Sequence, residues 1–119
     1  MNYKKHFSFQ YEVKVMSGKE ARKIVRKDCD RCRSNLRVAE SIGGKCLVNT
    51  CSRHLVAITW RNHNWFNGYG DLYLMKPSDA REFMPTECNI CKKNVELAER
   101  LKWKCIMDFK SKHIVAIAP

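Results

Sequence analysis

Residues 88–113 read CNICKKNVELAERLKWKCIMDFKSKH, and residues 29–54 read CDRCRSNLRVAESIGGKCLVNTCSRH. Each stretch holds a Cys-x2-Cys pair, then thirteen residues and a third cysteine, then seven residues and a histidine. Three thiolates and an imidazole form a ligand set of structural zinc sites, which are tetrahedral. The sequence therefore predicts two Zn²⁺ per chain, with these ligands: Cys29, Cys32, Cys46 and His54 in the first site, and Cys88, Cys91, Cys105 and His113 in the second.

Cysteines in such numbers can also form a disulfide framework, a redox pair or a buried apolar cluster. None of these alternatives requires four residues to recur at a fixed spacing. The count of seven cysteines is odd, and the sequence shows no run typical of a secretory signal. We therefore expect reduced thiols and an intracellular setting, in cytoplasm or nucleus, and a bacterial or viral source stays open.

Cys51 has no counterpart in the second stretch, where Lys110 stands. It could replace His54 as the fourth ligand of the first site, which would then have four cysteines. We favour His54 because its position is shared by both stretches, and we interpret Cys51 as a free thiol in a turn.

The similarity extends beyond the ligands at the same offset of 59 residues. It predicts an ungapped duplication with units at residues 7–60 and 66–119, joined by a partly ordered linker at 61–65. Units of this size bury little apolar surface, whereas structural zinc contributes about 10–16 kcal/mol in small finger peptides. Folding is therefore expected to depend on metal. Matched pairs outside the ligands include these: Met16 and Met75, Asn35 and Asn94, Glu40 and Glu99, Lys45 and Lys104.

Each unit is expected to begin with a strand, because residues 11–15 alternate between apolar and polar side chains and residues 72–75 correspond to them. A short helix follows, with Ser17 and Glu20 at capping-box spacing in the first unit and Ser78 as the cap in the second.

A second helix after the cysteine pair and a final hairpin complete the unit. Gly43-Gly44 ends this helix in the first unit. A hairpin centred near Phe109 would place Cys105 opposite His113. The predicted fold class is α+β: two tandem zinc modules, each with the order strand, helix, cysteine knuckle, helix, β-hairpin.

The net charge of +11 is unevenly distributed. Residues 1–59 carry 13 Lys and Arg against 5 Asp and Glu, and residues 60–119 carry 10 against 7. A concentrated basic surface beside a zinc knuckle is typical of proteins that bind phosphates of nucleic acids. The candidate residues in the first unit are these: Arg22, Lys23, Arg26, Lys27, Arg31, Arg33 and Arg37.

Two further pairs complete the predicted nucleic-acid surface. Lys92 and Lys93 follow the second knuckle, and Trp65 and Tyr69 near the junction could stack on unpaired bases if exposed. A base-reading helix pattern is missing, so single-stranded DNA or RNA is favoured over duplex DNA. The sequence thus predicts a non-catalytic, basic, zinc-binding regulatory protein that binds nucleic acid.

Two alternatives stay open. The zinc modules could instead hold a surface that docks on a transcription or host protein, with the second module as the contact and the positive charge steering the encounter. Asn62-His63-Asn64 also resembles the His/Asn motif of metal-dependent nucleases that carry zinc knuckles. Nuclease activity is the minor alternative, because no Asp or Glu lies close to this motif to complete a catalytic metal site.

Overall fold

The structure is a computed structural model that describes residues 4–5 and 13–119. The start of the predicted unit 7–60 and residues 11 and 12 of the predicted first strand lie outside the described residues.

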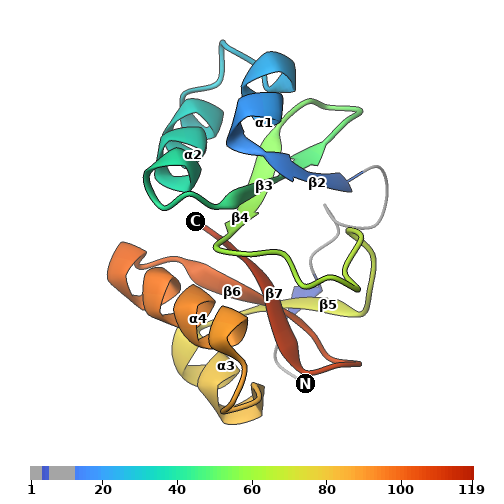
Figure 1. Cartoon of the computed structure of the whole chain (residues 1–119), viewed down its shortest axis with the longest axis vertical. Helices are drawn as coiled ribbons and strands as arrows, with labels where there is room; N and C mark the ends of the chain where they lie inside the picture. Colours follow the sequence, from blue (N-terminus) through green and yellow to red (C-terminus); the bar gives the residue numbers. More distant parts are fainter. Residues whose placement is uncertain (1–3, 6–12) are drawn as a thin grey trace.

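The described chain folds as a mixed α+β protein, as the sequence predicted (Figure 1). The order strand, helix, helix, strand, strand occurs twice. The elements are β1 (Lys4–Lys5), β2 (Val13–Ser17), α1 (Gly18–Ile24), α2 (Asp30–Ser41), β3 (Lys45–Asn49), β4 (Leu55–Thr59), β5 (Leu72–Met75), α3 (Pro77–Phe83), α4 (Asn89–Leu101), β6 (Lys104–Asp108) and β7 (His113–Ala118).

All strands in the described part of the chain belong to one antiparallel sheet with the order β1-β5-β6-β7-β4-β3-β2. Strands β4 and β7 meet at its centre, where Ile58 pairs with Ile117. These two residues are themselves 59 positions apart, so equivalent residues of the two halves face each other across this junction. The pairing covers one edge of β4 and one edge of β7, which each half alone would expose to solvent.

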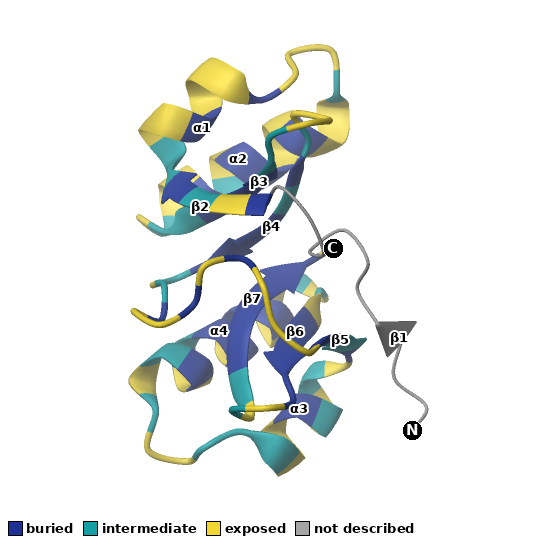
Figure 2. Cartoon of the chain, turned by 90° about the vertical axis from the view of Figure 1, so that its right-hand side faces the viewer, coloured by how far each residue is buried: buried dark blue, intermediate teal, exposed yellow. Residues whose placement is uncertain are grey.

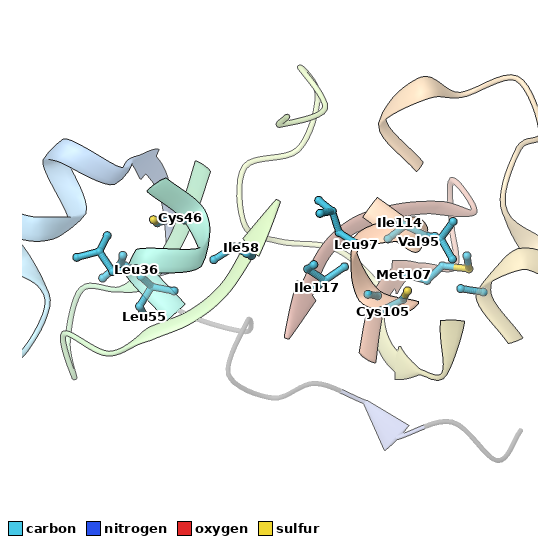
Figure 3. Packing of buried hydrophobic residues seen from close by; sticks show 14 of the residues in the cluster. Leu36, Cys46, Leu55, Ile58, Val95, Leu97, Cys105, Met107, Ile114 and Ile117 are labelled. Atoms are coloured by element: carbon cyan, nitrogen blue, oxygen red, sulfur yellow. The ribbon is translucent and has the colours of Figure 1, made fainter. Parts of the chain in front are cut away.

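Two apolar clusters lie on opposite faces of the sheet. The larger one lies under the helices and includes residues of both halves, among them Leu36 and Ile58 from the first half and Val95 and Ile117 from the second (Figure 3). The smaller one lies on the other face and includes Phe66. The outer surfaces of α1 and α2 are mostly exposed, as Figure 2 shows.

The stretch between the halves, where the sequence predicted a partly ordered linker at 61–65, holds a few buried residues among mostly exposed ones. Phe66 and His63 are buried, and the backbone N–H of Phe66 donates to the carbonyl of His63 at 3.0 Å. Gly68 adopts φ +98, and a Cβ there would lie 2.5 Å from the carbonyl oxygen of Val13. This stretch therefore closes over the face of the sheet opposite the helices.

The helix starts follow local capping rules, with one correction. The predicted capping box of Ser17 and Glu20 is present at the start of α1. The predicted cap at Ser78 is wrong, because α3 begins at Pro77 with Lys76 as its N-cap. Proline is favoured at the first helical position, since its fixed φ suits the helix and its missing N–H would be unpaired there anyway.

An equivalent ion pair links the two helices of each half. Arg22 on α1 pairs with Glu40 on α2, and Arg81 on α3 pairs with Glu99 on α4. Both pairs are exposed to solvent, so their contribution to stability is small.

No helix in the described part of the chain is long and apolar enough to cross a membrane.

The C-terminal ends of α2 and α4 offer a test of the fold. Gly43 follows α2 with φ 63, and Lys102 caps α4 with φ 60. Because a side chain costs energy in the left-handed region, Lys102→Gly is expected to raise the free energy of unfolding by about 1 kcal/mol. Urea unfolding of the metal-loaded protein measures this change.

Gly43→Ala is the matched control and should lower the unfolding free energy by a similar amount. No atom lies within 4 Å of the added Cβ at Gly43, so the cost of this substitution comes from the left-handed backbone conformation alone and not from a steric clash. Destabilisation by Lys102→Gly would contradict the left-handed cap at α4.

Candidate metal centres

Four side chains gather in the second half. The ligand atoms of His63, Cys88, Cys91 and His113 all lie within 4.8 Å of one another. The Sγ of Cys91 lies 3.3 Å from Nδ1 of His113 and 3.9 Å from Nε2 of His63. We call this group site 2.

Three side chains gather at the equivalent place in the first half. Cys29, Cys32 and His54 meet the same distance limit, and Sγ of Cys32 lies 3.2 Å from Nδ1 of His54. We call this group site 1. Metal bonds of about 2.0–2.3 Å in a tetrahedron separate neighbouring ligand atoms by about 3.3–3.8 Å. Both groups are compact enough to hold a metal ion.

The cysteine pairs sit at the N-termini of the longer helices. Cys29 is the N-cap of α2 and Cys88 the N-cap of α4, so each second cysteine lies in the first helical turn. Backbone N–H groups at a helix start carry partial positive charge and favour a thiolate. The N–H of Cys91 points at Sγ of Cys88 at 3.5 Å, and the backbone N–H of Cys32 lowers the pKa of Cys29.

The second cysteine of each pair also receives a hydrogen bond from the last strand of its half. The N–H of Leu55 donates to Sγ of Cys32 at 3.4 Å, and the N–H of Ile114 donates to Sγ of Cys91 at 3.3 Å. Each donor follows directly after the histidine of its site. These hydrogen bonds link the hairpin to the helix through the sulfur atom of the second cysteine. Hydrogen bonds to a metal-ligating side chain orient that side chain.

The histidines are placed by the hairpin turns. In the second half the carboxylate of Asp108 accepts from the N–H and hydroxyl of Ser111, and Ser111 Oγ accepts from the N–H of His113. In the first half, Asn49 Oδ1 accepts from the N–H of Ser52 at 3.0 Å. These side chains close the turns in the manner of Asx turns and fix where each histidine enters its strand.

The hairpin register corrects the predicted ligand set. Asp108 pairs with His113, and Cys105 pairs with Ile117, because the turn is centred about two residues later than predicted. Cys46 likewise pairs with Ile58. Cys46 and Cys105 therefore lie outside both sites, in the apolar cluster under the helices (Figure 3).

The surroundings of these two cysteines suit a neutral thiol. Both are fully buried, and burial raises the pKa of Cys46 to about 11 and that of Cys105 to about 12. A metal ligand must be a thiolate, whose charge is costly to place among apolar side chains. Their repeated spacing reflects equivalent core positions.

Cys51, the alternative ligand of the first site, lies exposed in the turn between β3 and β4. Its backbone N–H donates to Asn49 Oδ1 at 2.9 Å. Its thiol belongs to neither site, whereas His54, the favoured alternative, lies in site 1.

Sequence reasoning missed His63 as a member of site 2, since this residue stands in the predicted linker and has no repeat partner. Its ring is buried between Ile114 and Trp65. The Nε2 atom lies 3.1 Å from the carbonyl oxygen of Ile114, and the ring stacks on the indole of Trp65 with 5.3 Å between the ring centroids. Burial lowers the pKa of His63, so the imidazole is kept neutral, as a metal ligand must be. Ligation would require Nε2 to exchange the Ile114 hydrogen bond for the metal.

The predicted nucleic-acid residues lie at the surface. All seven in the first half are exposed, as are Trp65, Tyr69 and Lys92, and Lys93 is half-buried. Three of the arginines form ion pairs: Arg22 with Glu40, Arg26 with Asp28 and Arg33 with Asp30. Among described residues, the other four form no ion pair: Lys23, Lys27, Arg31 and Arg37.

Comparison with protein-family models, with curated proteins and with solved structures gives no match for this chain.

Metal stoichiometry distinguishes site ligands from core cysteines. Cys46→Ala and Cys105→Ala are expected to keep two metal ions per chain, whereas Cys91→Ser and Cys32→Ser should each lose one, because only the latter remove a ligand. Native mass spectrometry of the metal-loaded variants measures the count. A loss of one ion with either alanine variant would contradict the proposed ligand sets.

His63 can be tested separately. His63→Ala is expected to weaken metal binding at site 2 by at least about tenfold, since even the loss of an outer-shell partner costs about 10–100-fold. Competition with a chromophoric chelator measures the affinity. Asn64→Ala, next to it and exposed, is the control. Unchanged affinity in His63→Ala would mean that Nε2 only donates to Ile114.

Proposed function

We propose that this protein holds two zinc ions and binds single-stranded nucleic acid through the basic surface of its first half, as a non-catalytic regulator. Thiolate and imidazole together are the donors that structural zinc favours. The equivalent positions of sites 1 and 2, at the start of equivalent helices, support an internal duplication of one zinc-binding unit.

The observation that carries the nucleic-acid proposal is a basic surface around α1 and the start of α2. Two hollows of about 380 and 260 Å³ lie side by side on it and share Arg26 and Lys27. Lys23 and Arg53 add two cations to the lining of the first, which also includes the carboxylate of Asp28, and Arg22 and Arg33 add two to the second. Recesses lined with several cations favour phosphate oxygens, whose neutralisation releases counterions and drives binding.

One feature favours unpaired strands over a duplex. The exposed aromatic rings of Trp65 and Tyr69, 46 % and 51 % accessible, offer surfaces for base stacking. RNA and single-stranded DNA are therefore the proposed ligands.

A non-catalytic role is supported by the residues around the two sites. Site 2 offers four protein donors, which leaves no position for a substrate. Site 1 offers three, and the residues that line the hollow beside it include no Asp or Glu side chain that could act as a general base.

Charge neutralisation tests the proposed surface. A triple variant, Lys27→Gln with Arg31→Gln and Arg37→Gln, removes exposed cations that form no ion pair with described residues. The logarithm of the binding constant falls linearly with the logarithm of the salt concentration, and each phosphate contact contributes about 0.7 to this slope for single strands. The variant should therefore lower the magnitude of the slope by about 2. Fluorescence anisotropy with a labelled random-sequence RNA at several salt concentrations measures the slope.

The matched control removes the same charge from the second half: Lys76→Gln, Lys102→Gln and Lys104→Gln, all exposed. It should change the slope by less than 1. Equal effects of both triple variants would show attraction by net charge alone. A wild-type protein without salt-dependent binding would contradict the proposal and favour docking on another protein.

A further inference from the structure

The larger of the two basic hollows, of about 380 Å³, lies between the loop after α1 and the turn that joins β3 to β4. We call it the Arg53 hollow. Its charged lining consists of these residues: Lys23, Arg26, Lys27, Asp28 and Arg53. Among described residues, only Arg26 and Asp28 of this group form an ion pair. Three cations of the lining therefore have no negative partner in the described chain.

Backbone hydrogen bonds hold the two walls of the Arg53 hollow together. The N–H of Arg26 donates to the carbonyl of Arg53 at 3.1 Å, and the N–H of Arg53 donates to the carbonyl of Asn49 at 2.7 Å. Each wall also leads directly into site 1, because Cys29 follows the loop and His54 follows the turn. A metal ion at site 1 would therefore hold both walls in place.

The equivalent place in the second half has a different charge. The residues 59 positions later are Glu82, Pro85, Thr86, Glu87 and Lys112. They hold one cation and two carboxylates, a formal charge of −1, against four cations and one carboxylate in the first half, a formal charge of +3.

Two further differences remove the hollow's character from the second half. Pro85 stands where Arg26 donates to the turn, and proline has no N–H to donate. The ammonium group of Lys112, the equivalent of Arg53, lies over the ring of Phe109, 4.6 Å from its centroid. Its charge is thus engaged by an aromatic ring, a cation–π contact that Arg53 does not make with described residues. The group of unpaired cations is therefore a feature of the first half.

The charge of the Arg53 hollow indicates which phosphate it fits. A phosphodiester inside a strand carries one negative charge, fewer than the three unpaired cations of the lining. A phosphomonoester carries about two negative charges at pH 7 and has three acceptor oxygens. Guanidinium and ammonium groups bind such oxygens through charge-assisted hydrogen bonds. In a nucleic acid a phosphomonoester stands at a strand end, and a recess suits a group that ends within it.

We propose that the Arg53 hollow binds the terminal phosphate of a single nucleic-acid strand, and that the metal ion of site 1 holds the hollow in shape. Lys23, Lys27 and Arg53 supply the unpaired positive charge. Arg26 adds donors at Nη1, because only its Nε and Nη2 bond to Asp28. The remainder of the strand follows the basic surface of the first half, so this site depends on the proposed function.

The first test compares strand ends. A random-sequence RNA is labelled at one end, and its other end carries a phosphate or a hydroxyl group, in separate sets for the 5′ and the 3′ end. Zinc-loaded wild-type protein should bind one phosphorylated form about tenfold more tightly than its hydroxyl form, as measured by fluorescence anisotropy. A hydroxyl strand two nucleotides longer carries the same charge and should show no such gain.

The outcomes separate this site from the proposed function. Salt-dependent binding of all strands without preference for either phosphorylated end would overturn the terminal-phosphate site and leave the proposed function standing. An equal gain with the longer hydroxyl strand would also overturn it, because total charge would then explain the affinity. Absence of binding to every strand would overturn both.

Charge variants test the lining. Lys23→Gln with Arg53→Gln removes two unpaired cations, so the preference for the phosphorylated strand should fall from about tenfold to about twofold or less. Lys110→Gln with Lys112→Gln removes the same charge from the exposed turn of the second half and should keep the tenfold preference. Equal loss of preference in the two double variants would contradict the assigned lining.

Site 1 is tested through its ligands. Cys32→Ser, which should lose the ion of site 1, is expected to lose the preference, whereas Cys91→Ser, which should lose the ion of site 2, is expected to keep it. A preference that survives in Cys32→Ser without its ion would contradict the role of the metal, as would equal loss in Cys91→Ser. The charge variants retain every metal ligand and test the phosphate site even where Cys32→Ser does not fold.

A phosphopeptide presents the same phosphomonoester on another macromolecule. A labelled peptide with one phosphoserine among uncharged residues should bind more weakly than the phosphorylated RNA, because it brings no further phosphates to the basic surface. Tighter binding of the peptide would overturn the assignment to a strand end.

Discussion

In each half of this protein, two cysteines at the start of a helix meet a histidine at the start of the last strand, beside the apolar cluster that packs the helices on the sheet. In the second half, Cys88, Cys91 and His113 form this group; in the first, Cys29, Cys32 and His54 do. Each half alone, with two short helices over three strands, would bury little apolar surface. A metal ion bound at each group would join the helix start, the turn and the strand in a single unit.

The second constraint is the central pairing of β4 with β7, which turns two small sheets into one. Because Ile58 faces Ile117, the strand that ends each half leads towards the other half. After β4 the chain delivers His63 to site 2, whereas β7 ends at Ala118 beside site 1. The surroundings of the two equivalent sites therefore differ: site 2 has four candidate donors and is covered by Trp65, while site 1 has three and adjoins a hollow.

Much of this arrangement follows from local sequence signals, and the errors have identifiable causes. The Cys-x2-Cys pairs, the helices after them and the hairpins were predictable, because spacing and capping are local properties. Cys46 and Cys105 were misassigned because core positions repeat as regularly as ligands do, and a shift of two residues in the turn decides which residue faces the histidine. His63 could not be found from the repeat, since it reaches site 2 only through the pairing of β4 with β7.

The ligand count at the metals tests this account most directly. X-ray absorption at the zinc edge of the fully loaded protein reports the average number of sulfur and nitrogen neighbours. The account predicts about two sulfur atoms at about 2.3 Å and about two nitrogen or oxygen atoms at about 2.0 Å per zinc. Three sulfur atoms per zinc would contradict it, because Cys46 and Cys105 would then be ligands and the hairpins would have a different register.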